Sequence, residues 1–138
     1  DILVNNAGFL INKSFEETSY EDYKSVMDTN FWGAFKITQL LIKKLSNANG
    51  QVINISSMGG VNYSSKFSGL SLYSSSKGAL TILTECLAEE LKPHGIRVNA
   101  LALGAVQTEM LEKAFPEYKA EMSSIQMASY IITFANSV

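Results

Sequence analysis

Tyr73 and Lys77 are the two residues whose types and spacing are best suited to chemistry. They stand four positions apart in the segment Tyr-Ser-Ser-Ser-Lys, so a helix would place both side chains on one face. A tyrosine is a poor base at neutral pH because the reference pKa of its phenol is about 10. A nearby ammonium favours the phenolate and lowers that pKa, which makes proton transfer easier. The same spacing occurs by chance on solvated helices, so the pair alone is weak evidence for an acid–base site.

Two further polar features strengthen this interpretation. The pair Ser56-Ser57 follows an apolar run at 52–55, and the carboxyl end of a parallel strand opens into a ligand crevice. A hydroxyl there can hold a carbonyl oxygen beside the tyrosine, although a plain serine–glycine turn is the alternative. Asn30 falls in step with the apolar positions of a predicted helix, and a buried amide without partners costs about 1–3 kcal/mol. Asn30 is therefore either a structural residue bonded to nearby backbone or a functional one that bends the helix and holds a water near Lys77.

Three short apolar runs predict the strands that would position these residues. The runs cover 1–5, 51–55 and 96–102. They are rich in β-branched residues and almost continuously apolar, as is typical of parallel strands covered on both faces.

Segments with helical periodicity lie between and after the strands. The predicted helices run from about 18 to 45, 73 to 92, 108 to 114 and 124 to 135. Capping boxes are predicted for Thr18 with Glu21 and for Ser123 with Gln126. The alternation of strand and helix predicts a parallel α/β fold.

The predicted fold is a Rossmann-like doubly wound parallel sheet, of which residues 1–138 form a single partial domain. About three parallel strands with flanking helices match the C-terminal half of such a sheet, which is built from two βαβαβ halves. No Gly-x-Gly-x-x-Gly occurs among the nine glycines, so the loop that cradles a pyrophosphate is missing.

Composition excludes several classes of function. Apolar residues make up 46% and charged residues 17%, as in a globular protein, and the net charge of −2 argues against a broad basic face for nucleic acid. No apolar run approaches the roughly 18 residues that span a bilayer. The single cysteine, Cys86, and the single histidine, His94, cannot build a metal cluster. We expect a cytoplasmic protein with no metal site, no membrane span and no nucleic-acid partner.

The motifs together resemble the short-chain dehydrogenase/reductase family over nearly the whole chain. They occur in the family's order: Asn5-Asn6-Ala7-Gly8 after the first strand, Asn30, the strand that ends in Ser56-Ser57, Tyr73 to Lys77, and the segment 97–108. One departure is Leu103-Gly104, where the family usually has Pro-Gly; the lost proline predicts a more mobile loop.

The resemblance implies an NAD(P)-dependent oxidoreductase that interconverts a carbonyl and an alcohol by hydride transfer. Tyr73 would be the general acid/base, and Lys77 would lower its pKa and bind the nicotinamide ribose. Ser57 would polarise the carbonyl, and Asn30 would anchor a water in a proton relay. The cofactor-binding residues implied are Asn6, Ala7 and Gly8 on the adenosine side, Tyr73 and Lys77, and Val106 and Thr108 at the nicotinamide carboxamide.

The partners that the resemblance implies are NAD or NADP, a small carbonyl or alcohol substrate, and further copies of the chain in a homodimer or homotetramer. A non-catalytic cofactor-binding or interaction homologue is the alternative, as is an inactive truncated fragment. Because the phosphate-binding loop is missing, we expect residues 1–138 alone to bind cofactor weakly.

Overall fold

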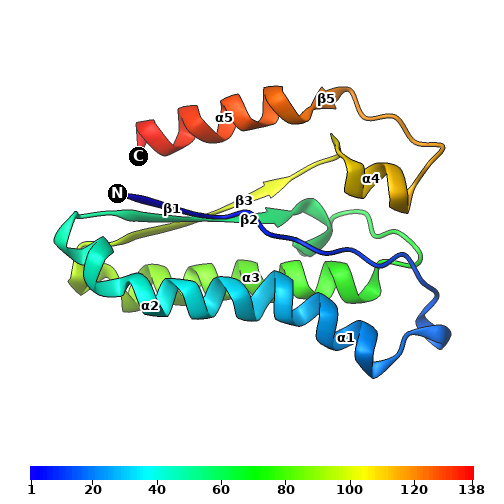
Figure 1. Cartoon of the computed structure of the whole chain (residues 1–138), viewed down its shortest axis with the longest axis horizontal. Helices are drawn as coiled ribbons and strands as arrows, with labels where there is room; N and C mark the ends of the chain where they lie inside the picture. Colours follow the sequence, from blue (N-terminus) through cyan, green and yellow to red (C-terminus); the bar gives the residue numbers. More distant parts are fainter. The chain divides into compact units, whose positions relative to one another are not determined.

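The computed structural model describes all 138 residues, which fall into two compact units (Figure 1). The first unit comprises Asp1–Ala102 and the second Leu103–Val138. The four residues expected to be catalytic all belong to the first unit.

A three-stranded sheet forms the centre of the first unit. Its strands are β1 (Ile2–Asn5), β2 (Gln51–Ser57) and β3 (Arg97–Leu103), in the order β1-β2-β3. β1 and β2 are parallel, with Ile2 opposite Gln51 and Asn5 opposite Asn54. β2 is buried over nearly its whole length, as its continuous apolar pattern predicts. The three predicted strands and the parallel α/β class are therefore confirmed.

β1 lies at the edge of this sheet, with β2 on one side only. Its side chains Ile2 and Val4 remain 46% and 40% exposed. This edge of the sheet is therefore apolar.

The helices of the first unit all cover one face of the sheet (Figure 1). They are α1 (Tyr20–Met27), α2 (Gly33–Asn47) and α3 (Ser71–Glu90). Two clusters of buried apolar side chains hold these helices to the sheet and to each other. One cluster consists of Leu45, Val52, Leu91, Ile96 and Val98. The other consists of Ala34, Leu80 and Leu83. Short 3-10 turns η1 (Phe15–Glu17), η3 (Met58–Gly60) and η4 (Lys92–His94) connect these elements.

The single helix expected from about 18 to 45 is instead two helices joined by a π-helical turn, η2 (Asp28–Trp32). The expected capping box of Thr18 with Glu21 is also wrong. Thr18 donates its hydroxyl to the Ser14 carbonyl, so the box forms one position later, between Ser19 and Asp22.

The second unit has two short strands and two helices. These are β4 (Val106–Gln107), α4 (Glu109–Ala114), β5 (Met122–Ser123) and α5 (Ser124–Ser137), and β4 pairs in parallel with β5. The capping box of Ser123 with Gln126 is confirmed. The two strands were not predicted, because two residues carry too little pattern to be recognised.

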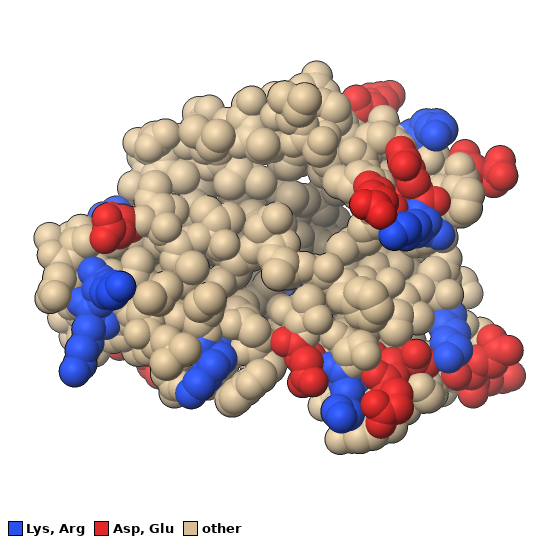
Figure 2. All heavy atoms as spheres, in the orientation of Figure 1, with Lys and Arg blue, Asp and Glu red and all other residues tan.

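No helix in either unit has both the length and the apolar character required to cross a bilayer. On the face drawn in Figure 2, acidic and basic side chains lie next to one another and form no broad area of one sign.

Candidate active site

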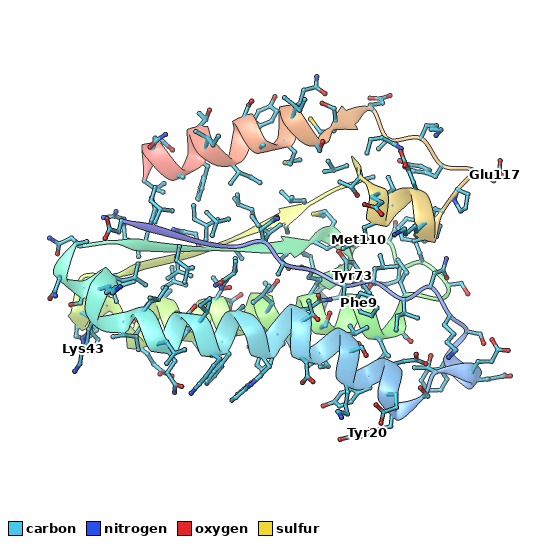
Figure 3. All side chains as sticks on the ribbon, viewed as in Figure 1. Phe9, Tyr20, Lys43, Tyr73, Met110 and Glu117 are labelled. Carbon is cyan, nitrogen blue, oxygen red and sulfur yellow. The ribbon has the colours of Figure 1, made fainter.

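Tyr73, labelled in Figure 3, lies in the first turn of α3. Lys77 follows one turn later in the same helix. The Lys77 Nζ lies 5.8 Å from the centre of the Tyr73 ring, so the two side chains share a face as expected. Lys77 is only 3% exposed. Its ammonium donates to the carbonyl oxygen of Ile55 at 2.7 Å. That carbonyl is its only hydrogen-bond acceptor within the chain, so two ammonium protons remain available to a ligand.

A close approach of two glycines brings the end of β2 onto α3. A Cβ atom on Gly60 would lie 2.6 Å from the backbone nitrogen of Gly78 and from the carbonyl carbon of Lys77. Only a glycine allows the η3 turn to lie against the helix backbone at this distance. This contact sets the position of Ser57, immediately before η3, relative to Tyr73.

The two serines at the end of β2 have different surroundings. The buried Ser56 donates its hydroxyl to the Lys77 carbonyl at 3.0 Å and lies 2.8 Å from the Thr81 hydroxyl. Ser57 instead forms a side-chain hydrogen bond with Tyr73 and accepts one from the Gly59 N–H at 3.2 Å. The structure therefore brings Ser57 to the tyrosine, while Ser56 ties the strand to the helix.

Asn30 lies inside the π-helical turn and is 1% exposed. Its Oδ1 accepts from the backbone N–H of Phe9 at 2.7 Å, and its Nδ2 donates to the Phe9 carbonyl at 2.9 Å and to the Ser76 hydroxyl at 2.9 Å. Ser76 in turn donates to the carbonyl of Tyr73 at 2.7 Å. The amide of Asn30 thus fastens the segment after β1 to the turn of α3 that carries Tyr73.

A second buried polar network lies behind the site and was not predicted. Asn5 Nδ2 donates to Asn54 Oδ1 at 2.8 Å and to the Thr38 hydroxyl at 3.2 Å. Asn54 Nδ2 donates to the Thr84 hydroxyl at 2.9 Å. The signal that could have revealed this network is Asn54 itself, a polar residue in the middle of an apolar strand.

Burial sets the pKa values of the central pair. It raises the pKa of the Tyr73 phenol above its usual 10.0, and the hydrogen bond with Ser57 opposes this more weakly. Burial also lowers the pKa of the Lys77 ammonium from 10.5 to about 8. The expected lowering of the Tyr73 pKa by Lys77 is therefore not found in this structure. The ammonium bonds the Ile55 carbonyl and not the phenol oxygen, so desolvation dominates.

The expected cofactor-binding residues occupy two places. Asn6, Ala7 and Gly8 directly follow the carboxyl end of β1, where ligands bind in open α/β sheets. Val106 and Thr108 belong to the second unit, which is described by itself. There Val106 lies in β4, and the hydroxyl of Thr108 accepts from the N–H of Leu111 at 3.2 Å as the N-cap of α4.

A family model described as short chain dehydrogenase matches residues 1–119. The chain is 36% identical over 114 residues to 3-oxoacyl-(acyl-carrier-protein) reductase FabG of Thermotoga maritima, which covers 82% of this chain and 45% of that protein. It is 37% identical over 112 residues to carbonyl reductase (NADPH) 2 of Sus scrofa, covering 80% and 45% of the two chains. The chain thus spans about half the length of these curated relatives.

Solved structures give the same result for the fold. A 4-hydroxyisoleucine dehydrogenase mutant complexed with NADH and succinate has a TM-score of 0.85 and 26% sequence identity to this chain. The match covers 97% of this chain and 60% of the dehydrogenase chain. A gluconate 5-dehydrogenase from Burkholderia cenocepacia in complex with NADP and tartrate has a TM-score of 0.77 and 28% sequence identity to this chain. That match covers 86% of this chain and 45% of the gluconate 5-dehydrogenase chain.

Proposed function

Since the chain belongs to the short-chain dehydrogenase family, we propose that the intact protein is an NAD(P)-dependent oxidoreductase that interconverts a carbonyl compound and an alcohol. The observation that carries this proposal is the buried Lys77 ammonium beside the ring of Tyr73, whose phenol is hydrogen-bonded to Ser57. A tyrosine, a lysine and a serine held this way offer a proton donor, a cation and a carbonyl-orienting hydroxyl at one point.

The chemistry assigned to these side chains follows from their surroundings. In carbonyl reduction the Tyr73 hydroxyl donates its proton to the oxygen that becomes an alkoxide, and Ser57 orients that oxygen by a hydrogen bond. Because burial raises the pKa of Tyr73, the phenol is protonated at neutral pH and is ready to act as the acid. In the oxidation direction Tyr73 must first release its proton to solvent, and the resulting phenolate then removes the alcohol proton.

The residues of this chain fit a nicotinamide cofactor. Lys77 has two ammonium protons without an acceptor in the chain, which suits the hydroxyl groups of a ribose. Asn6, Ala7 and Gly8 would line the adenosine side, and Val106 and Thr108 would meet the nicotinamide carboxamide. When bound, the cofactor supplies or accepts the hydride. The named complexes of the similar structures contain NADH and NADP, and either cofactor is consistent with this proposal.

We also propose a homodimer or homotetramer built on the outer face of η2 and α2. Trp32 stacks on Phe35 with ring centres 5.2 Å apart, yet Trp32 and Leu40 remain 51% and 68% exposed. An apolar strip of this kind on a long helix is a typical contact surface for a second copy. The cytoplasmic location remains a prediction.

The experiment that tests the function is oxidation of NADH and NADPH by the intact protein with a panel of carbonyl compounds. Tyr73→Phe removes only the phenol oxygen, and we expect it to reduce turnover by about 100-fold or more. Tyr20→Phe is the matched control, because Tyr20 is an exposed residue of α1. Full activity in Tyr73→Phe would contradict the assigned role. Cofactor binding without turnover by the wild-type protein would favour a non-catalytic homologue.

A further inference from the structure

A groove of about 530 Å³ opens in the first unit along a face of α3 different from the one that carries Tyr73 and Lys77. Its walls come from α3, from the loop between β2 and α3, and from the η1 turn. The residues that matter most are Gly59, Lys66, Ser74, Ser75, Phe15 and Phe67.

Lys66 brings a positive charge to this groove without a counter-ion. Its ammonium donates to the carbonyl of Val61 at 2.7 Å and to the carbonyl and hydroxyl of Ser64 at 3.0 and 2.6 Å. All these acceptors are neutral, and no carboxylate forms a salt bridge with Lys66. The sequence contains no Asp or Glu between Asp28 and Glu85. The three hydrogen bonds of Lys66 use all three of its ammonium protons, so a ligand with one negative charge would replace one of these neutral acceptors and gain an ion pair that the chain itself does not provide.

The rest of the groove is suited to an amphiphilic ligand. The hydroxyls of Ser74 and Ser75 belong to residues that line the groove, and a hydroxyl can donate to an oxygen atom of a ligand. Phe15 and Phe67 are largely exposed and offer aromatic surface at the groove. Together these residues match a carboxylate attached to an apolar body.

The groove begins next to the candidate catalytic serine. Gly59 lines the groove, its N–H donates to the Ser57 hydroxyl, and a Cβ atom on Gly59 would lie 2.8 Å from Ser74 Oγ. Gly59 is therefore a neighbour of both Ser57 and the groove, which places the groove next to the carbonyl oxygen that Ser57 would orient.

We propose that this groove is a specificity subsite for the carboxylate end of the substrate, with Lys66 as its charge partner. The preferred substrates are then carbonyl compounds that carry a carboxylate on an apolar chain. This inference rests on the proposed function, because the carbonyl end is placed at Ser57 and Tyr73.

The test uses methyl-ketone carboxylates of increasing chain length and their methyl esters, which differ from the acids in charge. We expect the intact protein to have a KM roughly tenfold lower for the best acid than for its ester. Lys66→Met should abolish this preference by raising the KM for the acid to that for the ester, while Lys66→Arg should retain it. Lys43→Met, at an exposed position of α2, is the control.

Three results would overturn the subsite: equal KM values for acid and ester, a preference that persists in Lys66→Met, or equal losses for acid and ester in that variant. The last result would mean that Lys66 only holds its loop. Calorimetric titration of the same pairs separates the two proposals. Tighter binding of the acid by a protein without turnover would reject the oxidoreductase function but retain the subsite, whereas equal binding rejects the subsite.

Discussion

The side-chain amide of Asn30 donates to the hydroxyl of Ser76 at 2.9 Å, across 46 positions of the sequence. Ser76 lies between Tyr73 and Lys77 in α3, and Asn30 also holds both backbone polar groups of Phe9. One buried amide thus joins the segment that follows Asn6–Gly8 to the helical turn that carries the acid–base pair. Asn30 is in this respect a positioning residue, and the water that it was expected to anchor remains a prediction.

Asn30→Ala should destabilise the protein markedly. The substitution removes three hydrogen bonds and leaves the Phe9 N–H and carbonyl without their partner, so we expect a loss of about 2–4 kcal/mol in the free energy of unfolding. Urea denaturation of the intact protein measures this loss. Asn47→Ala, at an exposed position of α2, should change the free energy by less than about 0.5 kcal/mol. Equal stability of the two variants would contradict the positioning role.

The site could be predicted largely because its residues depend on local periodicity. Tyr73 and Lys77 lie on one face of any helix that contains both. Ser57 lies at the end of a strand that the apolar run at 52–55 predicts. The π-helical turn at Asp28–Trp32 was outside the reach of such reasoning. It coincides with Asn30, whose partners Phe9 and Ser76 are distant in sequence and are known only from the fold.

The groove beside α3 was missed for a similar reason. Its loop, from Gly59 to Leu70, is polar and has no period, so the sequence does not predict a groove there. The neutral surroundings of Lys66 depend on the path of that loop.

Lys77 should make the stability of the protein depend on pH. Burial lowers its pKa from 10.5 to about 8, so above pH 8 the folded state releases a proton that the unfolded state keeps until about pH 10.5. The stabilising contribution of the neutral amine is therefore present at high pH and lost as the pH falls through about 8. Between pH 7 and pH 9.5 we expect a gain of about 2 kcal/mol, at about 1.4 kcal/mol per pKa unit.

The measurement is the free energy of unfolding over this pH range for wild type, Lys77→Met and Lys43→Met. The gain should disappear in Lys77→Met and persist in Lys43→Met, which alters an exposed lysine. The upper limit of pH 9.5 keeps Tyr73 out of the comparison. Its raised pKa gives stability that is present below about pH 10 and lost at higher pH. Parallel curves for wild type and Lys77→Met would show that Lys77 titrates as it does in the unfolded chain.

Gly60→Ala should destabilise the junction of β2 and α3. The added Cβ would lie 2.6 Å from backbone atoms of Lys77 and Gly78, so the η3 turn has to move away from the helix. We expect a loss of about 1–3 kcal/mol in the free energy of unfolding together with lower turnover, since Ser57 precedes that turn. Gly104→Ala is the matched control, because its Cβ would meet no atom within 4 Å and its φ is not positive. A Gly60→Ala variant as stable as Gly104→Ala would mean that the turn adjusts without strain.

The two serines at the end of β2 offer the sharpest separation of structure from chemistry. Ser57→Ala removes the hydroxyl bonded to Tyr73, and we expect turnover to fall by about 100-fold with little change in stability, because Ser57 is only partly buried. Ser56→Ala removes a buried hydroxyl that ties β2 to the Lys77 carbonyl and to Thr81, and it should cost about 1–3 kcal/mol of stability. Steady-state turnover and urea denaturation are measured on both variants.

Comparing the Ser56→Ala and Ser57→Ala variants shows which serine has a catalytic role and which a structural one. If Ser56→Ala lowers turnover only in proportion to the fraction unfolded, its role is structural, and the loss in Ser57→Ala then reports on the carbonyl oxygen that Ser57 orients. The opposite pattern, with turnover lost in Ser56→Ala at full stability and retained in Ser57→Ala, would assign the carbonyl to Ser56. That result would also remove the link between the catalytic serine and the Lys66 groove, because Gly59 contacts Ser57 alone of the two hydroxyls.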